Sequence, residues 1–157
     1  MNDWSHKDIW TARAERNGRI CVIEVSRHTK EWVGRQREAG NPYIDPFEDE
    51  NGWCIYALIY PEHPLFALID PSKKEWENEA IQEMPLHGGC TYFVPHFSPA
   101  KEITSYEIGC DYSHYGDGHC AHYATKEEAQ EIFDDADELM EWLLSYSPST
   151  ATETEAV

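Results

Sequence analysis

The stretch WCIYALIY, residues 53–60, is a continuous apolar and aromatic run that lies between Gly52 and Pro61. It is too short for an isolated helix and is rich in residues that favour β structure. The run therefore predicts a central, buried strand. Three aromatic residues are expected to fill the face of its sheet: Trp53, Tyr56 and Phe93.

Two hairpins are predicted on either side of this strand. Residues 8–25 contain two β-prone runs around Asn17-Gly18, the dipeptide that best accepts the positive φ angles of a type I′ turn. Residues 90–97 and 103–110 form a second pair of runs, separated by the turn sequence SPAK. The sequence thus supplies four or five antiparallel strands.

The clearest helix is predicted over residues 125–146. Thr125 and Glu128 have the spacing of a capping box. Apolar residues then recur on one helical face, namely Ile132, Ala136, Leu139 and Leu143. Weaker patterns indicate short helices over residues 71–84 and 29–38.

These elements predict an α+β fold, an antiparallel sheet of four or five strands with a C-terminal amphipathic helix packed on one face. A chain of 157 residues is long enough for one domain with its own core. We expect a single domain over residues 1–147 and a flexible tail over residues 148–157.

The formal net charge of −18 constrains the partners. It disfavours direct binding to nucleic acid or to anionic membranes, and it would suit a protein that imitates nucleic acid and occupies a basic surface. The plainer interpretation is that the charge keeps the protein soluble. No apolar run is long enough to span a membrane and the N-terminus lacks a signal-peptide pattern, so we expect a cytoplasmic protein. Five cysteines without a CxxC pair do not suggest disulfides.

The predicted helix carries many acids on its polar face. Those near its C-terminal end oppose the helix dipole, so their density does not serve helix stability. We therefore expect this face to meet a basic partner protein, through Glu127, Glu131, Asp134, Asp135 and Glu138.

Two polar segments could form a pocket. MPLHGGC, residues 84–90, holds a histidine and paired glycines, and CDYSHYGDGHCAHY, residues 110–123, follows a strand end. The candidate pocket residues are His87, Gly88, Gly89, Thr91, Asp111, His114 and Asp117. One interpretation is a pair of turns with capping side chains; the other is a site in which histidines act as acids, bases or donors.

The same segments offer weaker signals for other chemistry. Zinc could be bound by Cys110, His114, His119, Cys120 and His122, but their spacing matches no established zinc pattern, so no metal or cofactor is predicted. Ser113 beside His114 lacks a nucleophile elbow, and a pair of Cys90 with His114 requires the fold to bring them together. Nucleotide-binding glycine motifs are absent from the sequence.

Three ordered motifs resemble a family of small uncharacterised proteins of tailed phages and prophages. The motifs are GWCIYALIYPEHPL, LHGGCTY and IGCDYSHYGDGH, and the resemblance covers roughly residues 52–119. It implies a phage origin and a common site with His63, His87, Thr91, Asp111, His114 and Asp117. Tyr112 stands where the family usually has cysteine and Cys110 where it has an aromatic residue, which argues against cysteine-dependent activity.

These observations lead to two expectations from different functional classes. The first is a non-enzymatic, anti-CRISPR-like counter-defence protein that inhibits a host defence or regulatory protein through the acidic helix, in the host cytoplasm. The second is a small-molecule site around His87, Asp111 and His114 that sequesters or hydrolyses a nucleotide signal. A third, a structural component of the virion, remains open.

Overall fold

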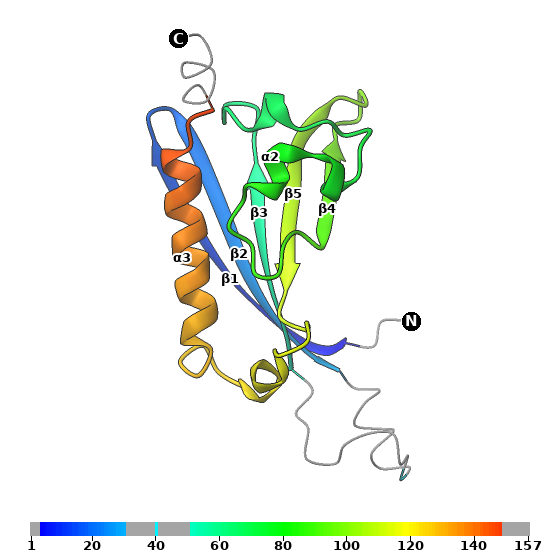
Figure 1. The fold of residues 1–157 in the computed structure, drawn as a ribbon, viewed down its shortest axis with the longest axis vertical. Coiled ribbons are helices and arrows are strands. Elements are labelled where there is room, and N and C mark those ends of the chain that lie inside the picture. The colour runs from blue at the N-terminus through cyan, green and yellow to red at the C-terminus, as the bar shows by residue number, and fades with distance from the viewer. Residues whose placement is uncertain (1–3, 31–39, 41–50, 149–157) are drawn as a thin grey trace.

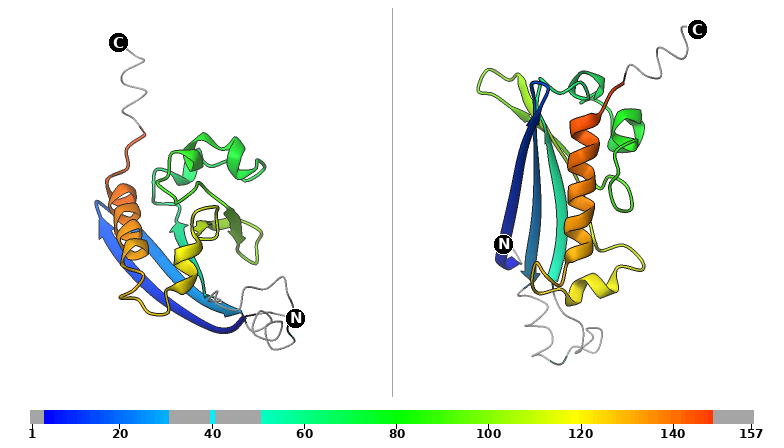
Figure 2. Two further views of the ribbon diagram at one scale, coloured as in Figure 1. Left: turned by 60° about the horizontal axis from the view of Figure 1, so that its bottom comes forward. Right: turned by 90° about the vertical axis from the view of Figure 1, so that its left-hand side faces the viewer.

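The computed structural model describes residues 4–30, 40 and 51–148. It has one antiparallel sheet with the strand order β1-β2-β3-β5-β4, and the helices lie on one face of it (Figures 1 and 2). The strands are β1 (Trp4–Arg16), β2 (Arg19–Lys30), β3 (Asn51–Ile59), β4 (Tyr92–Phe97) and β5 (Ile103–Asp111). The helices are α2 (Glu79–Gln82) and α3 (Gln130–Ser145), with short 3-10 turns η1 (Phe66–Leu68), η2 (Glu75–Glu77) and η3 (Gly118–His122). The predicted α+β class is confirmed.

Some expectations fall elsewhere in the chain. The short helix predicted over residues 29–38 lies outside the described residues from residue 31 onward, and residues 29 and 30 end β2. The tail lies outside them from residue 149. No helix in the described ranges is both long and apolar enough to cross a membrane.

The run that begins at Trp53 is the central strand, β3, as predicted. Its side chains alternate, and Trp53, Ile55, Ala57 and Ile59 are buried on the face that α3 covers. Tyr56 has the opposite parity, so the expectation that it shares a face with Trp53 is wrong. Its ring instead meets Tyr92 edge to face on the far side of the sheet, at 5.1 Å between centroids.

The β1–β2 hairpin turns at the predicted dipeptide. Asn17 and Gly18 have φ angles of 53° and 80°, the left-handed pair that a type I′ turn requires. This turn fixes the register, so that Trp10 pairs with Val25. Trp10 then stacks on Trp53 at 5.6 Å, which joins the first strand to the centre of the core.

Helix α3 buries the predicted apolar stripe, Ile132, Ala136, Leu139 and Leu143, against the sheet. It begins at Gln130, later than predicted. Thr125 Oγ1 does accept a hydrogen bond from the Glu128 amide at 3.2 Å, but the residues that follow form a turn rather than the first turn of the helix. Thr125 therefore caps the approach to α3 instead of its first residue.

The C-terminal end of α3 is held by groups from other elements. Arg19 of β2 donates to the carbonyls of Leu143 and Tyr146, at 3.2 and 2.7 Å. Arg16 binds Glu141 with two contacts, at 2.9 and 3.1 Å. These cations offset the acids that oppose the helix dipole, so part of the acidity of α3 has a structural explanation.

The segment predicted as a short helix over residues 71–84 contains one, α2, but it is confined to Glu79–Gln82 and preceded by the separate 3-10 turn η2. Asn78 is buried, and its side chain binds the backbone of Asp70 through both its oxygen and its nitrogen and also reaches the carbonyl of Lys74. An amide side chain that bonds nearby backbone groups competes with helical hydrogen bonds. The chain therefore breaks between η2 and α2.

Candidate functional site

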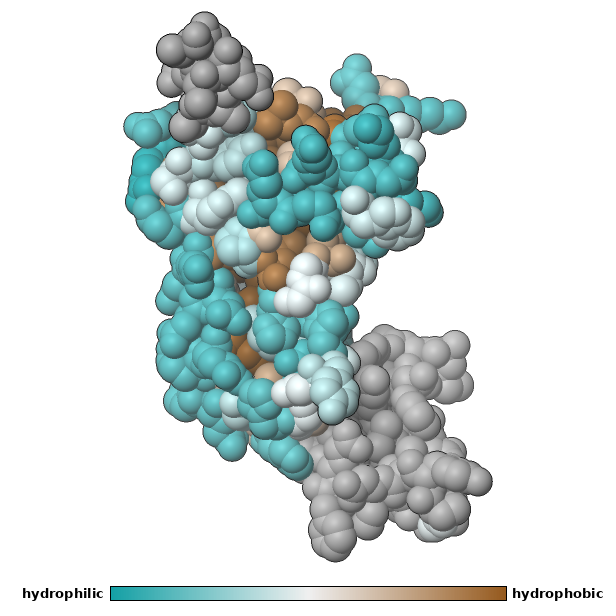
Figure 3. Space-filling model, viewed as in Figure 1, coloured by the Kyte–Doolittle hydropathy of each residue, from teal (hydrophilic) through white to brown (hydrophobic). Residues whose placement is uncertain are grey.

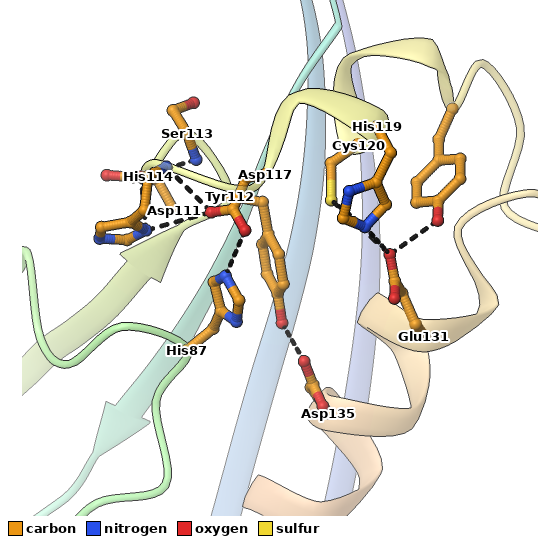
Figure 4. Close-up of polar contacts among 11 residues, drawn as sticks. His87, Asp111, Tyr112, Ser113, His114, Asp117, His119, Cys120, Glu131 and Asp135 are labelled. Carbon is orange, nitrogen blue, oxygen red and sulfur yellow. Dashed lines mark hydrogen bonds and ion pairs between the residues drawn. The ribbon is translucent and has the colours of Figure 1, made fainter.

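The candidate pocket lies where the end of β5 meets the segment before β4 (Figure 4). Asp111 ends β5, and His114 and Asp117 belong to the loop that follows it. His87 comes from the segment between α2 and β4. Two parts of the chain that are about thirty residues apart thus contribute to one cluster, as expected from their position at adjacent strands.

Asp117 is the centre of this cluster. Its Oδ1 lies 2.8 Å from Nε2 of His87, and its Oδ2 lies 3.3 Å from Nδ1 of His114. The backbone amide of His114 also donates to Oδ2, at 2.9 Å. Each carboxylate oxygen therefore contacts one imidazole nitrogen.

Burial and hydrogen bonding act on Asp117 in opposite directions. The residue is only 7% exposed, and its desolvation raises the pKa of the carboxyl group, whereas the bonds from the His114 amide and from His87 lower it. The bonds prevail, so the pKa of Asp117 lies below its ordinary value. Asp117 is therefore a buried anion that faces two imidazoles.

Asp111 forms the outer side of the cluster. Its Oδ1 accepts a hydrogen bond from the Ser113 amide at 3.0 Å, and its Oδ2 accepts one from the Thr91 hydroxyl at 3.2 Å. The same Oδ1 lies 3.6 Å from Nδ1 of His114. Thr91 thus links the start of β4 to the end of β5 and orients a second carboxylate toward the histidine.

The paired glycines have different functions. Gly88 has a φ of +70°, and a Cβ there would lie 2.8 Å from Cε1 of His114. Gly89 has a φ of +88°, but a Cβ there would meet nothing within 4 Å. Gly88 therefore lets the two segments approach, whereas Gly89 serves only the turn that its amide closes onto Leu86.

The support beneath His87 comes from residues to which the sequence assigned no part in the site. Tyr112 stacks on the His87 ring at 4.3 Å, with 12° between the planes, and donates its hydroxyl to Asp135 of α3 at 2.5 Å. Cys110 is buried in the core on the same face of β5 and its extension as Tyr112. The signal that could have found them is parity, since residues 106, 108, 110 and 112 alternate toward the core.

A second polar cluster lies on the other side of Tyr112, next to α3 (Figure 4). Oε1 of Glu131 accepts hydrogen bonds from His119 at 2.9 Å and from the Tyr123 hydroxyl at 2.7 Å. The Cys120 thiol lies 3.7 Å from the same oxygen. Of the zinc ligands weighed from sequence, His119 and Cys120 thus converge with each other, while His114 belongs to the Asp117 cluster.

The acids assigned to a partner surface do not form one uniform group. Glu131 is bonded within the second cluster, and Asp135 is half-buried beneath Tyr112. Asp134 and Glu138 are exposed on α3, and Glu127 is exposed in the turn that precedes it. The visible surface over this helix is largely hydrophilic, and hydrophobic residues appear in the hollow beside it (Figure 3).

The cysteines are poor candidates for nucleophiles. Burial raises the pKa of the Cys90 thiol, which donates to the Tyr92 carbonyl. Burial also raises the pKa of Cys110 to about 12. Both side chains are thiols rather than thiolates near neutral pH, and a thiol is a weak nucleophile.

Comparison of the chain with family models, with curated proteins and with solved structures gives no match. The site is therefore interpreted from its own geometry.

Proposed function

We propose that the cluster of His87, Asp111, His114 and Asp117 is a binding site for a phosphate-bearing small molecule, a nucleotide signal that the protein sequesters. The convergence of the His87 segment with the loop after β5 carries this proposal. Structural capping alone would not need two imidazoles on one buried carboxylate. Surface histidines more often find backbone or solvent partners.

The exposure of the cluster suits a ligand from solution. The side chains of His87 and His114 are 35% and 32% exposed, whereas the Asp117 side chain between them is 8% exposed. Imidazole N–H groups are donors that phosphate oxygens accept. Tyr115, in the same loop, is fully exposed and offers an aromatic face on which a base can stack.

Hydrolysis through a covalent protein intermediate is disfavoured, because the described residues of the cluster offer no activated nucleophile. The Ser113 amide is bonded to Asp111, and among the described residues its hydroxyl makes no hydrogen bond with a histidine. The buried thiols have raised pKa values. Non-enzymatic binding therefore agrees best with the chemistry available.

Thermal-shift measurements with a panel of mononucleotides, cyclic nucleotides and dinucleotides test this function. We expect one class to raise the melting temperature of the intact chain, and His87→Gln and His114→Gln to abolish the effect. His96→Gln is the matched control, because His96 pairs with Glu107 on the sheet and lies outside the cluster. A response of equal size in all four proteins, or none in any, would refute the proposal.

A second function, inhibition of a host defence or regulatory protein, is favoured by the exposed acids of α3 and of the turn before it. Glu127, Asp134 and Glu138 are exposed and belong to a chain of net charge −18, which favours association with a basic surface. Asp135 and Glu131 support the fold and are excluded from the surface we assign. This partner would be a host protein that binds nucleic acid. The acidic face would imitate nucleic acid and occupy the basic surface of that protein.

Pull-down from host lysate with charge-reversed variants separates the two functions. The triple variant Glu127→Lys, Asp134→Lys and Glu138→Lys is expected to lose a partner that His87→Gln retains. Retention of every partner by the triple variant would exclude the acidic face. The phage origin and the cytoplasmic location are proposals that rest on the motif resemblance and on the sequence.

A further inference from the structure

The cluster contains the donor set of a transition-metal site. One ring nitrogen of His87, one ring nitrogen of His114 and a carboxylate oxygen of Asp117 all lie within 4.8 Å of one another. Imidazole nitrogen together with carboxylate oxygen suits zinc and its neighbours rather than magnesium or calcium, which prefer oxygen alone. The residue types thus select a class of ion before distances are considered.

The spacing of these atoms is close to what an ion requires. Tetrahedral zinc with bonds of about 2.0–2.1 Å separates its ligand atoms by roughly 3.3 Å. The distance from His114 Nδ1 to Asp117 Oδ2 is 3.3 Å, and that from His87 Nε2 to Asp117 Oδ1 is 2.8 Å. The two histidines contact different oxygens of Asp117, so an ion held by all three residues would take the place of the His87–Asp117 hydrogen bond and be bound by one or both of these oxygens.

The surroundings hold the ligands in orientation. The His114 amide fixes Asp117, and the stacked ring of Tyr112 fixes the plane of His87. Asp111 lies 3.6 Å from Nδ1 of His114 and is itself oriented by Thr91. Groups that orient ligands in this way raise metal affinity. Asp111 can serve as a fourth ligand or yield its position to a ligand from solution.

A metal ion would offset the electrostatic repulsion between the proposed ligand and the protein. The proposed nucleotide is an anion, and the protein has a net charge of −18. In the described part of the chain, the hydrogen bonds of the Asp117 carboxylate come from His87 and His114 and none comes from a lysine or arginine. A divalent cation supplies the positive charge that the side chains lack.

We propose that His87, His114 and Asp117, with Asp111 beside them, bind a divalent transition-metal ion such as zinc. This inference rests on the proposed function insofar as the ion would receive the phosphate of the nucleotide. The cluster of His119, Cys120 and Glu131 is the internal comparison. There one oxygen, Oε1 of Glu131, already receives bonds from His119, Cys120 and Tyr123.

The test uses the intact chain after treatment with EDTA and dialysis. Calorimetric titration with Zn²⁺ is expected to show one ion per chain, with affinity lowered on the order of 100-fold in His87→Gln and in His114→Gln. The matched control His119→Gln is expected to bind as wild type does. Normal affinity in the first two variants, or loss in the control alone, would overturn the site.

A measurement on the unmodified chain covers the case in which a variant does not fold. Co²⁺ at the His87 site is expected to give d–d absorption without a sulfur-to-cobalt charge-transfer band, because the three ligands are nitrogen and oxygen. A strong charge-transfer band would show that a cysteine, such as Cys120, is a ligand and would contradict the proposal.

The two proposals can fail separately. If Zn²⁺ binds as described but no nucleotide responds with or without it, the metal site stands and the nucleotide function falls. If a nucleotide binds equally well in EDTA and in Zn²⁺, the nucleotide function stands, and the proposal that the metal ion binds the phosphate of the nucleotide is refuted. A nucleotide response that appears only with Zn²⁺ supports both.

Discussion

Gly88 lies against the imidazole of His114, so closely that a Cβ on Gly88 would be 2.8 Å from Cε1 of the ring. Both segments of the site therefore depend on a residue without a side chain. This contact explains why the turn before β4 and the loop after β5 can share one carboxylate, Asp117.

Substitution of Gly88 by alanine is predicted to damage the site more than the fold. The positive φ costs about 1–2 kcal/mol in the free energy of unfolding, and the exposed side of the His114 ring can move to relieve the clash. We expect the NMR signals of His114 to shift and binding at the site to be lost. Gly89→Ala also places alanine at a positive φ, but its Cβ would meet nothing within 4 Å. Its free energy of unfolding, measured in urea, should therefore fall by a similar amount, while the NMR signals of His114 stay as in wild type. Equal signals in both variants would contradict this role of Gly88.

Removal of the Tyr112 hydroxyl is predicted to destabilise the protein. Tyr112→Phe leaves the half-buried carboxylate of Asp135 without its 2.5 Å partner, and hydrogen bonds to charged groups contribute about 1.5–3 kcal/mol. Burial, followed by this hydrogen bond, raises the pKa of Tyr112. Tyr123→Phe, which removes a hydroxyl from exposed Glu131, should have a smaller effect. Equal midpoints of urea unfolding for wild type and Tyr112→Phe would show that the bond contributes nothing.

The stability of the protein is predicted to fall below neutral pH because of His63. Its Nδ1 accepts the Leu65 amide at 3.0 Å, so its Nε2 carries the proton and donates to the Leu143 carbonyl at 2.7 Å. Burial lowers the pKa of His63 from its ordinary value of 6.5. Because the unfolded chain then takes up a proton that the folded chain does not, stability is present above pH 6.5 and is lost as the pH falls toward the folded pKa.

Urea unfolding from pH 7.5 to pH 5.5 measures this effect. His63→Gln retains a donor and an acceptor but does not titrate, so its midpoint should depend less on pH than that of wild type. An identical dependence in both proteins would assign the effect to other histidines.

Most of the fold could be predicted from the sequence because its signals are local. The central strand predicted from the apolar run at residues 53–60, the Asn17-Gly18 turn and the apolar stripe of α3 all appear in the structure. The break between η2 and α2 has no local signal because it depends on the side chain of Asn78. This side chain is hydrogen-bonded to the backbone of Asp70, eight residues earlier in the chain. A buried side chain that competes for the hydrogen bonds of the helix backbone leaves no periodic pattern in the sequence.

The candidate site was predictable in part. His87, His114 and Asp117 were selected as a group, and the antiparallel sheet brings them together. The contributions of Tyr112 and Asp135 were not, because the acids of α3 look alike in sequence and only packing distinguishes Asp135 from exposed Asp134. Of the zinc ligands weighed from sequence, His114 lies in one cluster and His119 and Cys120 lie in the other, while Cys110 and His122 belong to neither.

Loss of the Tyr115 ring is predicted to weaken nucleotide binding without affecting the metal. The ring is fully exposed beside His114, and stacking on a base contributes about 1–3 kcal/mol. Tyr115→Ala should therefore raise the Kd of the responding nucleotide by roughly tenfold, while the Kd for inorganic phosphate and the affinity for Zn²⁺ stay as in wild type. Fluorescence or calorimetric titration measures all three. Unchanged nucleotide affinity would exclude Tyr115 as the stacking platform.

A crystal structure of the chain grown with Zn²⁺, with diffraction recorded on both sides of the zinc absorption edge, tests the central claim most directly. We predict an anomalous peak about 2.0–2.2 Å from Nε2 of His87, from Nδ1 of His114 and from a carboxylate oxygen of Asp117. A peak only beside His119 and Cys120, or a His87–Asp117 hydrogen bond unchanged in the presence of the ion, would contradict it.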